Sequence, residues 1–518
     1  MSEHREPAAA SPTAANPEIV ELTENVAGSQ YYSADLAPIP ASDRKWGTRD
    51  LAMLWISMSA CIPTYMLASS LIDIGMDWKQ AVLTIFLGNC IVLVPMIMNA
   101  HAGTRYGIPF PVYCRASFGI RGANVPALMR ALVACGWFGI QTWIGGIALH
   151  TLLQRLWFPG WRTAETLPGL DITVPQLACF LAFWLLNVFV VWRGMESIRL
   201  LLNIKAPLLI LLGLVLLAWA YYEAGGFGPM LSQRSQFAPG GAKEGQFWTF
   251  FFPALTANVS FWATLSLNIP DFSRFAYSQR AQALGQIVGL PPTMALYSFI
   301  GVAVTSATVV IYGAPIWDPV LLLEKFSSPL ALVIAMLALG VATLATNIAA
   351  NVVGPANDFA HLWPKRISFR MGGLITGLLG IVIQPWRLLA NASVYIDKWL
   401  IGYSLLLGAC GGVLIADYFV IRRARLDLPA LYRSSGTYWY RGGFNPWALV
   451  ALTAGILPCL PGFAVTAGLL DAATIDPSGL WRQIYSYAWF VSFAVSFVGY
   501  VVLMKAFSKE RRTGNAVP

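Results

Sequence analysis

Apolar stretches long enough to cross a membrane alternate with short polar segments along the chain. A helix needs roughly 20 apolar residues to cross a hydrocarbon core about 30 Å thick. Twelve such stretches lie near residues 51–72, 79–101, 125–153, 174–193, 201–222, 247–269, 284–312, 329–353, 369–386, 394–420, 445–470 and 483–505. The pattern predicts an all-α integral membrane protein with twelve transmembrane helices, called spans 1 to 12 in chain order.

Composition and the placement of basic residues agree with this pattern. The chain of 518 residues is 57% hydrophobic and 11% charged, whereas soluble proteins carry about 25% charged residues. If both termini are cytoplasmic, 25 of the 34 Lys and Arg residues fall on the cytoplasmic side, where basic residues collect. We therefore expect a multi-pass protein of the cell membrane with both ends in the cytoplasm. The net charge of +9 then follows from topology and indicates no nucleic-acid partner.

The two ends of the chain and the cysteines predict little structure of their own. Residues 1–45 are polar and rich in Ala, Pro and Ser, without the apolar core of a signal peptide. We expect them to form a flexible cytoplasmic tail, with a second, short tail at 507–518. The seven cysteines are scattered, mostly within apolar runs and without CxxC spacing, so we expect neither a disulfide nor a metal cluster.

One proline-containing apolar segment occurs twice, at the start of each half of the chain. Trp55–Tyr65 reads WISMSACIPTY and Trp262–Phe272 reads WATLSLNIPDF, with Trp, Ser, Ile and Pro at the same offsets. Proline removes an amide donor and clashes with the preceding turn, so Pro63 and Pro270 would each loosen their helix. Many secondary transporters contain two inverted halves, each with a discontinuous helix whose freed backbone groups bind substrate and ion. Spans 1 and 6 are interpreted in this way; the alternative is a chance match, because Pro and Trp are common in membrane helices.

Span 3 carries an aromatic ring and an amide on one helix face, in the segment WFGIQTW. Trp137 and Gln141 are four residues apart and therefore share a face. An amide inside a membrane is costly unless it has a hydrogen-bond partner. That partner is either a ligand or a neighbouring helix.

Span 8 carries two polar stripes, in the segment ATLATNIAANVVGPAND. Asn347 and Asn351 form one stripe, and Ala342 and Thr346 form another about 100° away. Small residues between them suit close helix packing, which is one interpretation. The other is that the two stripes face two adjacent sites, one lined by amides and one by a hydroxyl and nearby carbonyls.

Four ordered motifs carry a resemblance to a known family. They are YGIPFPVYCRASFGIRGANVPALMRALVACGWFGIQTW, WATLSLNIPDFSRF, the Asn-rich segment of span 8, and IADYFVIRRARLDLPALY at 415–432. Over roughly residues 46–505 the chain resembles the nucleobase:cation symporter family 1, which includes hydantoin and allantoin transporters. The resemblance implies alternating access in a core of two inverted five-helix repeats, 46–222 and 223–425, with two extra helices in 426–506.

The resemblance also implies a substrate site. The substrate ring would lie between Trp137 and Trp262, and Gln141 and Asn351 would hydrogen-bond its amide edge. Leu400 in span 10 would close the outer side. Cys61 stands where the hydantoin transporter has a glutamine, which puts identical substrate choice in doubt because a thiol is a weak hydrogen-bonding group. With the neighbouring Asn347, the candidate substrate-binding residues are Trp137, Gln141, Trp262, Asn351, Cys61, Asn347 and Leu400.

A candidate sodium site follows from the same resemblance. The implied ligands are carbonyls at Ser57, Ala60 and Ala342, with hydroxyls at the positions of Ala345 and Thr346. Because Ala345 has no hydroxyl, the site is weakened, and proton coupling stays open as the alternative. We expect no cofactor apart from such a bound cation.

The remaining polar residues bear on the function class. Asp, Glu and His are absent from the middle of spans 1, 3, 6 and 8, which favours a neutral, flat, amide-edged ring such as uracil, cytosine, hydantoin or allantoin as substrate. The four histidines are dispersed, without the clustered acid–base groups of an enzyme. We expect a monomeric, cation-coupled symporter in the lipid bilayer; the alternatives are a non-transporting sensor and a channel-like facilitator of the same fold.

Overall fold

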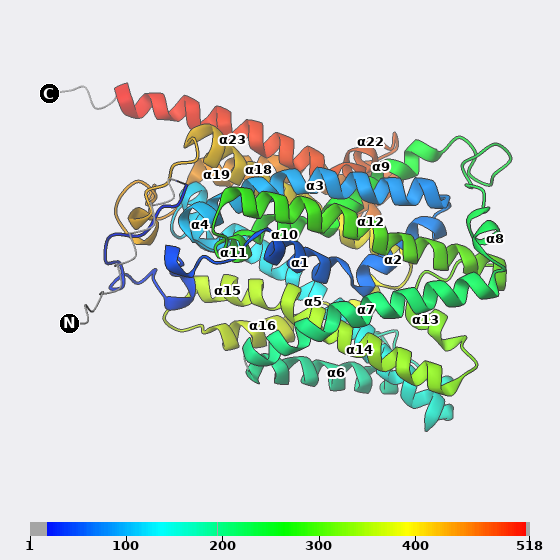
Figure 1. The fold of residues 1–518 in the computed structure, drawn as a ribbon. Coiled ribbons are helices and arrows are strands. Elements are labelled where there is room, and N and C mark those ends of the chain that lie inside the picture. The colour runs from blue at the N-terminus through cyan, green and yellow to red at the C-terminus, as the bar shows by residue number, and fades with distance from the viewer. Residues whose placement is uncertain (1–17, 194, 514–518) are drawn as a thin grey trace, which may run out of the picture.

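The helices of the molecule run side by side along one axis (Figure 1). The computed structural model describes residues 18–193 and 195–513, which form helices and three isolated β-bridges. Within these ranges, eight helices are long and apolar enough to cross a membrane, or nine when the bent pair in span 1 is counted. Two shorter apolar helices, in spans 5 and 9, and the interrupted helix of span 6 complete the set. Every predicted span therefore coincides with helical structure.

Several spans consist of more than one helix. Span 1 consists of α1 (Thr48–Ser59) and α2 (Ile62–Asp73). Spans 2 to 5 are single helices: α3 (Trp78–Tyr106), α5 (Asn124–Leu156), α6 (Val174–Arg193) and α7 (Met195–Glu223). Span 6 consists of α9 (Phe247–Phe261), α10 (Ala263–Asn268) and α11 (Pro270–Ser273). Spans 7 to 9 are α12 (Gln279–Tyr312), α14 (Pro329–Asn351) with α15 (Val353–Leu362), and α16 (Phe369–Val382) with α17 (Pro385–Leu388). Spans 10 to 12 are η4 (Val394–Leu400), α18 (Ile401–Ile415) and η5 (Ala416–Ile421); α19 (Pro446–Ile456), η7 (Leu457–Cys459) and α20 (Leu460–Ala467); and α23 (Ala488–Thr513).

Short helices connect the spans. They are η1 (Ala34–Leu36), η2 (Ala41–Asp43), α4 (Phe110–Phe118), η3 (Pro159–Thr163), α8 (Phe227–Leu231), α13 (Pro319–Glu324), η6 (Pro429–Tyr432), α21 (Ala472–Ile475) and α22 (Leu480–Ser486). The first described residues and the end of α23 lie at the same end of the bundle (Figure 1). This end is called the terminal end below.

Span 1 is broken where the repeated motif predicts it. α1 and α2 meet at 57°, and Cys61 between them is extended, with φ −150° and ψ 159°. The amide of Cys61 donates to the carbonyl of Ser59 (3.0 Å), and the amide of Thr64 donates to that of Cys61 (3.1 Å). In an uninterrupted helix these amides would bond the carbonyls of Ser57 and Ala60. Neither amide therefore makes the helical bond to these two carbonyls.

Span 6 is broken at its repeated tryptophan. α9 ends at Phe261, Trp262 leaves the helical region with φ −100° and ψ 6°, and α10 begins at the next residue. The amide of Ser266 donates back to the carbonyl of Trp262 (2.8 Å). A second, smaller interruption at Ile269 precedes Pro270. The main discontinuity thus lies at the tryptophan itself, whereas in span 1 it directly precedes the proline-bearing helix.

Close backbone contacts fix the position of α5, the helix that carries the WFGIQTW segment. α5 packs against α6, α14, α15 and α16. A Cβ atom built on Gly139 would lie 2.5 Å from the carbonyl oxygen of Gly380 in α16, a distance that no larger residue tolerates. Small residues permit such close approach between membrane helices.

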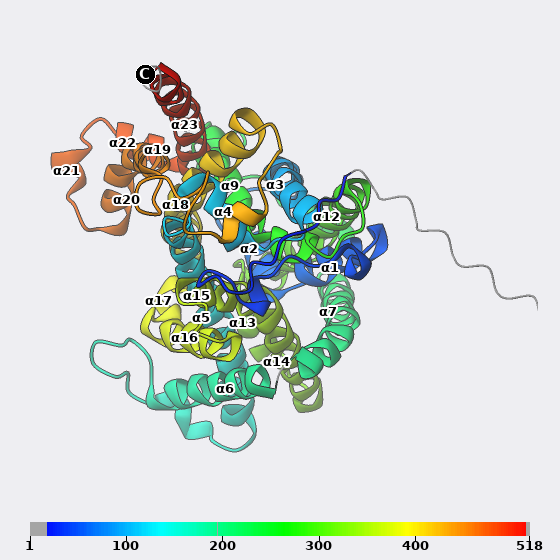
Figure 2. The same ribbon diagram turned by 90° about the vertical axis from the view of Figure 1, so that its left-hand side faces the viewer.

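The segment 18–45 differs from the expected flexible tail, because it packs across the terminal end (Figure 2). Leu36 is fully buried. The amide of Val20 donates to the carbonyl of Arg105 (2.8 Å), and the buried Arg44 guanidinium donates to the carbonyls of Ile39 (2.8 Å) and Thr104 (3.0 Å). Burial lowers the pKa of Arg44 to about 10, so it stays charged near neutral pH. The last turn of α3 has carbonyls without helical partners, and these hold the segment in place. Of the expected C-terminal tail, residues 507–513 continue α23 instead. Residues 1–17 and 514–518 lie outside the described residues.

Candidate substrate and cation sites

Trp137 lies at the centre of a buried aromatic cluster that joins spans 3, 6 and 10. Its ring makes edge-to-face contacts with the rings of four neighbours, at centroid distances of 5.3 to 6.4 Å. These neighbours are Phe261, Tyr395, Trp399 and Tyr403. Such pairs stabilise beyond the area that they bury. The five residues are called the Trp137 cluster below.

Trp262 joins this cluster from the break in span 6. Phe261 contacts Trp137 on one side and Trp262 on the other (5.0 Å between ring centroids). Trp262 in turn meets Trp55 edge-on, at 5.3 Å. The two tryptophans of the repeated motif are therefore in contact, and Phe261 links them to Trp137. The indole nitrogens of Trp55 and Trp262 are buried and have no hydrogen-bond acceptor among the described residues.

Gln141 is buried one turn beyond Trp137. Its side chain is 4% exposed, and its carboxamide oxygen has no donor within the described part of the chain. A buried polar atom without a partner costs about 1–3 kcal/mol. Gln141 therefore offers an unused acceptor beside the aromatic cluster, as expected for a group that faces a ligand.

Asn347 forms hydrogen bonds to neighbouring helices, which agrees with the helix-packing interpretation of its stripe. Its amide nitrogen lies 3.1 Å from the carbonyl oxygen of Phe138, 3.0 Å from the hydroxyl of Thr142 and 3.1 Å from the carboxamide oxygen of Asn187. Its own oxygen accepts a hydrogen bond from the amide of Asn351 (3.0 Å). Phe138 and Thr142 directly follow Trp137 and Gln141 in the chain, so these bonds join spans 3, 4 and 8 next to the cluster and orient Asn351.

Cys61 lies in the break of span 1, and Leu400 lies at the end of η4 in span 10. The Cys61 sulfur, in the break of span 1, lies 3.2 Å from the Thr64 hydroxyl. The hydroxyl of Tyr395 donates to the carbonyl of Pro63 (3.4 Å), which connects the Trp137 cluster to the same break. Leu400 is fully buried at the end of the π-helical η4.

The residues proposed for the cation lie in two places. The carbonyls of Ser57 and Ala60 belong to the end of α1, next to the break. In α14, the hydroxyl of Thr346 donates to the carbonyl of Ala342 (2.9 Å), and Ala345 beside it is buried. These are the oxygen ligands that hard cations prefer. No group of three or more His, Cys, Asp or Glu side chains able to hold a metal ion is found within the described ranges.

Sequence reasoning missed the aromatic residues of span 10. Tyr395, Trp399 and Tyr403 all contact Trp137, and they recur every fourth residue, which places aromatic rings along one helix face. That spacing was available in the sequence. Phe261 precedes the repeated motif and carried no signal of its own.

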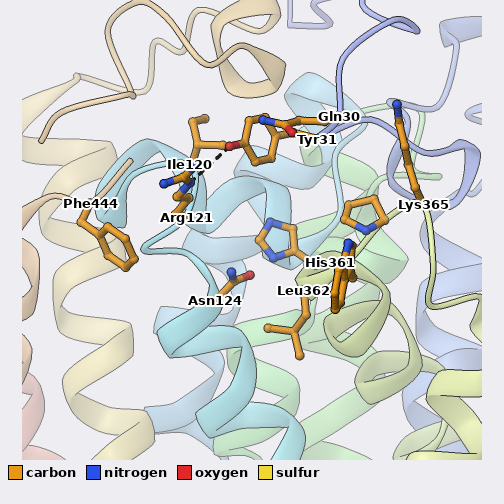
Figure 3. A pocket seen from close by; sticks show the side chains of 11 residues that line it. Gln30, Tyr31, Ile120, Arg121, Asn124, His361, Leu362, Lys365 and Phe444 are labelled. Carbon is orange, nitrogen blue, oxygen red and sulfur yellow. Dashed lines mark hydrogen bonds between the residues drawn. The ribbon is translucent and has the colours of Figure 1, made fainter. Parts of the chain in front are cut away.

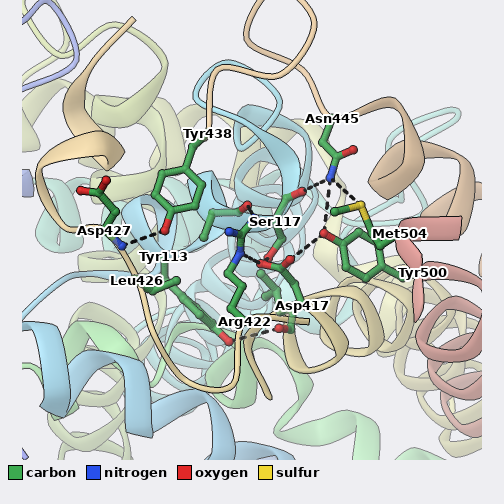
Figure 4. Close-up of polar contacts among 12 residues, drawn as sticks. Tyr113, Ser117, Asp417, Arg422, Leu426, Asp427, Tyr438, Asn445, Tyr500 and Met504 are labelled. Atoms are coloured by element: carbon green, nitrogen blue, oxygen red, sulfur yellow. Dashed lines mark hydrogen bonds and ion pairs between the residues drawn. The ribbon is translucent and has the colours of Figure 1, made fainter. Parts of the chain in front are cut away.

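Two ion pairs with buried carboxylates lie toward the terminal end. Arg130 of span 3 pairs with Asp358 of span 8 (3.2 Å), and both side chains are fully buried. Asp417 pairs with Arg422 (2.7 Å) and accepts hydrogen bonds from Ser117 and Tyr500, as Figure 4 shows. A buried charge requires such partners. The residues around Trp137 that are named above are uncharged.

Comparisons with known proteins place the chain among permeases. The family described as permease for cytosine/purines, uracil, thiamine and allantoin matches residues 38–492. The purine-uracil permease NCS1 of Arabidopsis thaliana is 47% identical over 483 residues, which are 92% of this chain and 78% of that protein. An allantoin permease of Bacillus subtilis is 40% identical over 479 residues, 92% of this chain and 94% of that protein.

A solved structure supports the same fold. Mhp1, described as a nucleobase-cation-symport-1 family transporter in a closed conformation with bromovinylhydantoin bound, superposes with a TM-score of 0.73 at 23% identity. The match covers 93% of this chain and 96% of that one. The predicted fold class is confirmed: twelve spans, an inverted-repeat core and discontinuous helices in spans 1 and 6.

The contacts of Asn347 predict a structural role for its side chain. Asn347→Leu should lower the free energy of unfolding by roughly 1–3 kcal/mol, because the carboxamides of Asn187 and Asn351 lose a buried partner. SDS titration in mixed micelles measures this. Asn89→Leu is the matched control, since Asn89 is equally buried but its amide donates only to Ile85 of its own helix. Equal losses in the two variants would contradict the role.

Proposed function

Because the chain belongs to the family of permeases for cytosine/purines, uracil, thiamine and allantoin, we propose that it imports a neutral nucleobase or related ring by cation-coupled symport with alternating access. The observation that carries the proposal is the position of the Trp137 cluster. It lies against the breaks of both discontinuous helices, through Phe261 and Trp262 in span 6 and through Tyr395 and Pro63 in span 1.

The chemistry of this region favours a flat, uncharged substrate. Trp137 and Trp262 supply aromatic faces for stacking, and Gln141 and Asn351 supply amides that match the alternating N–H and C=O groups of uracil, cytosine, hydantoin or allantoin. An ionised substrate would need a countercharge, and the buried carboxylates of Asp358 and Asp417 are already paired. The purine-uracil, allantoin and hydantoin names of the similar proteins support the same class.

The other candidate residues receive supporting roles. Leu400 would close the outer side of the site, and Asn347 would hold Asn351 in place rather than contact substrate. The Cys61 thiol forms only weak hydrogen bonds. It would therefore bind the substrate edge near the span 1 break less tightly than a glutamine would.

For the cation, we propose a weak sodium site between spans 1 and 8. The carbonyls of Ser57, Ala60 and Ala342 and the hydroxyl of Thr346 would be its ligands. Ala345 removes one oxygen from the shell, and proton coupling is the alternative.

The proposal extends to location and organisation. The protein would act as a monomer in the cell membrane with both termini cytoplasmic, and the distribution of Lys and Arg supports this orientation. The repeats would span 46–222 and 223–425, with 426–506 as the two added helices. A non-transporting sensor or a channel-like facilitator of the same fold is the alternative function.

Uptake by proteoliposomes tests the function. Liposomes with the purified protein should accumulate radiolabelled uracil or allantoin above the outside concentration when a sodium or pH gradient is applied. Substrate that only equilibrates would indicate a facilitator. Binding without uptake would indicate a sensor.

We predict that removal of either tryptophan ring weakens substrate binding. Trp137→Ala and Trp262→Ala should each weaken substrate binding by on the order of 1–3 kcal/mol, the scale of base–aromatic stacking. Isothermal titration of the purified variants measures this. Trp192→Ala is the control, because Trp192 lies on the outside of α6 and is 55% exposed. Unchanged binding in both test variants would remove stacking from the proposal.

We predict that sodium binding and substrate binding are coupled through the candidate cation ligands. Sodium should raise substrate affinity, and substrate should raise sodium affinity by the same factor. Thr346→Ala should abolish this coupling, and Ala345→Ser should strengthen it by restoring a hydroxyl. Thr376→Ala is the matched control, since the Thr376 hydroxyl also bonds the carbonyl four residues back, in α16. Affinities that follow pH and ignore sodium in every variant would establish proton coupling instead.

A further inference from the structure

A cavity lies at the terminal end, apart from the Trp137 cluster. It has a volume of about 390 Å³, within the range of small-molecule sites. Four segments that are distant in the sequence line it: 30–31, the turn before α5, the end of α15 with the residues after it, and Phe444 (Figure 3). Asn124, which lines it, precedes Trp137 by about 20 Å along α5 at 1.5 Å per residue. The cavity is therefore distinct from the proposed substrate site.

The charged side chains that line the cavity are both basic. They are Arg121 and Lys365, and no Asp or Glu is among the described lining residues. Neither forms an ion pair within the described part of the protein. Arg121 is instead held by neutral groups: its Nε donates to the Tyr31 hydroxyl (3.3 Å), and its guanidinium lies 5.2 Å from the Trp439 ring centroid. Two exposed cations without an ion-pair partner in the described part of the protein thus line one cavity.

A buried histidine adds a directed donor to the same wall. His361 is 4% exposed, and its Nε2 accepts a hydrogen bond from Nε of the fully buried Arg115 (2.9 Å). Arginine can only donate, so Nε2 must carry the lone pair and the ring proton must be on Nδ1. Nδ1 is buried and has no acceptor among the described residues. Figure 3 shows the His361 ring between Asn124 and Lys365 in the cavity lining.

We propose that this cavity binds the phosphate group of a small phosphorylated molecule. Arg121 and Lys365 would neutralise its charge, and the Nδ1–H of His361 would donate to one oxygen. A phosphate monoester presents nearly two negative charges and three acceptor oxygens, which matches two cations and a third donor better than a carboxylate does. Tyr31, Trp363 and Phe444 offer apolar surface for the organic part. A soluble phosphate monoester and the headgroup of an anionic lipid share this chemistry.

Thermal unfolding of the purified full chain in a neutral, phosphate-free detergent buffer tests the proposal, because a ligand that binds the folded state raises its melting temperature. The soluble probes are inorganic phosphate and uridine 5′-monophosphate. The lipid probe is short-chain phosphatidylglycerol, compared with phosphatidylcholine. At least one probe should stabilise the protein saturably, beyond chloride at matched ionic strength.

The double variant Arg121→Gln/Lys365→Gln should weaken the apparent affinity for that probe at least tenfold. Arg425→Gln is the control, because it removes an exposed charge near the same end, and it should leave the affinity unchanged. An effect confined to phosphatidylglycerol would identify a lipid headgroup as the source, and an effect of the soluble probes would identify a free phosphate. The proposal is overturned if no probe stabilises the protein beyond chloride, or if the double variant responds like the wild type. This outcome is independent of substrate uptake.

Discussion

A polypeptide inside a bilayer must satisfy its backbone hydrogen bonds internally, and this constraint decides where the chain can depart from a helix. Irregular backbone is tolerated only where protein surrounds it. The breaks obey this rule: Ala60 and Cys61 in span 1 and Trp262 in span 6 are all buried. Because the breaks cannot face lipid, the irregular backbone at both sites lies inside the molecule, next to the residues that we propose for substrate and cation.

Two kinds of contact surround these breaks: hydrogen bonds between helices and edge-to-face ring contacts. Asn347, with three acceptors around its amide and Asn351 on its oxygen, sets the position of span 8 against span 3. The Trp137 cluster fills the space beside it with edge-to-face rings. Gln141 and the two indole nitrogens of the repeated motif keep polar atoms that no described residue satisfies. Rigid hydrogen bonds therefore support a lining whose own polar groups stay available for a ligand.

The sequence predicts the features that depend on local pattern and misses those that depend on distant contacts. Apolar length located the spans, and the repeated motif located both breaks. Trp137 and Gln141 were found from their shared helix face, but neither the stripe at 395, 399 and 403 nor its contact with Trp137 was. The packing of 18–45 was also missed, since it depends on carbonyls at the end of α3 that composition does not reveal. The pair of Arg130 and Asp358 joins residues 228 positions apart, which no local pattern indicates.

Two sets of polar contacts join different groups of spans, and this division bears on how such a fold moves. In the first set, Asn347 ties spans 3, 4 and 8, Arg130–Asp358 ties spans 3 and 8, and the Trp184 indole donates to Gly377 between spans 4 and 9.

In the second set, Asn99 donates to the carbonyl of Ser266 and Thr104 to that of Ser273, between spans 2 and 6, and Ser69 donates to the carbonyl of Gly301, between spans 1 and 7. Between the two sets, Trp137 meets Phe261 through ring contacts, which are less directional than hydrogen bonds. A rotation of one set against the other at this contact would preserve the buried hydrogen bonds and ion pairs within each set. The aromatic contact that we assign to substrate thus lies between the two sets.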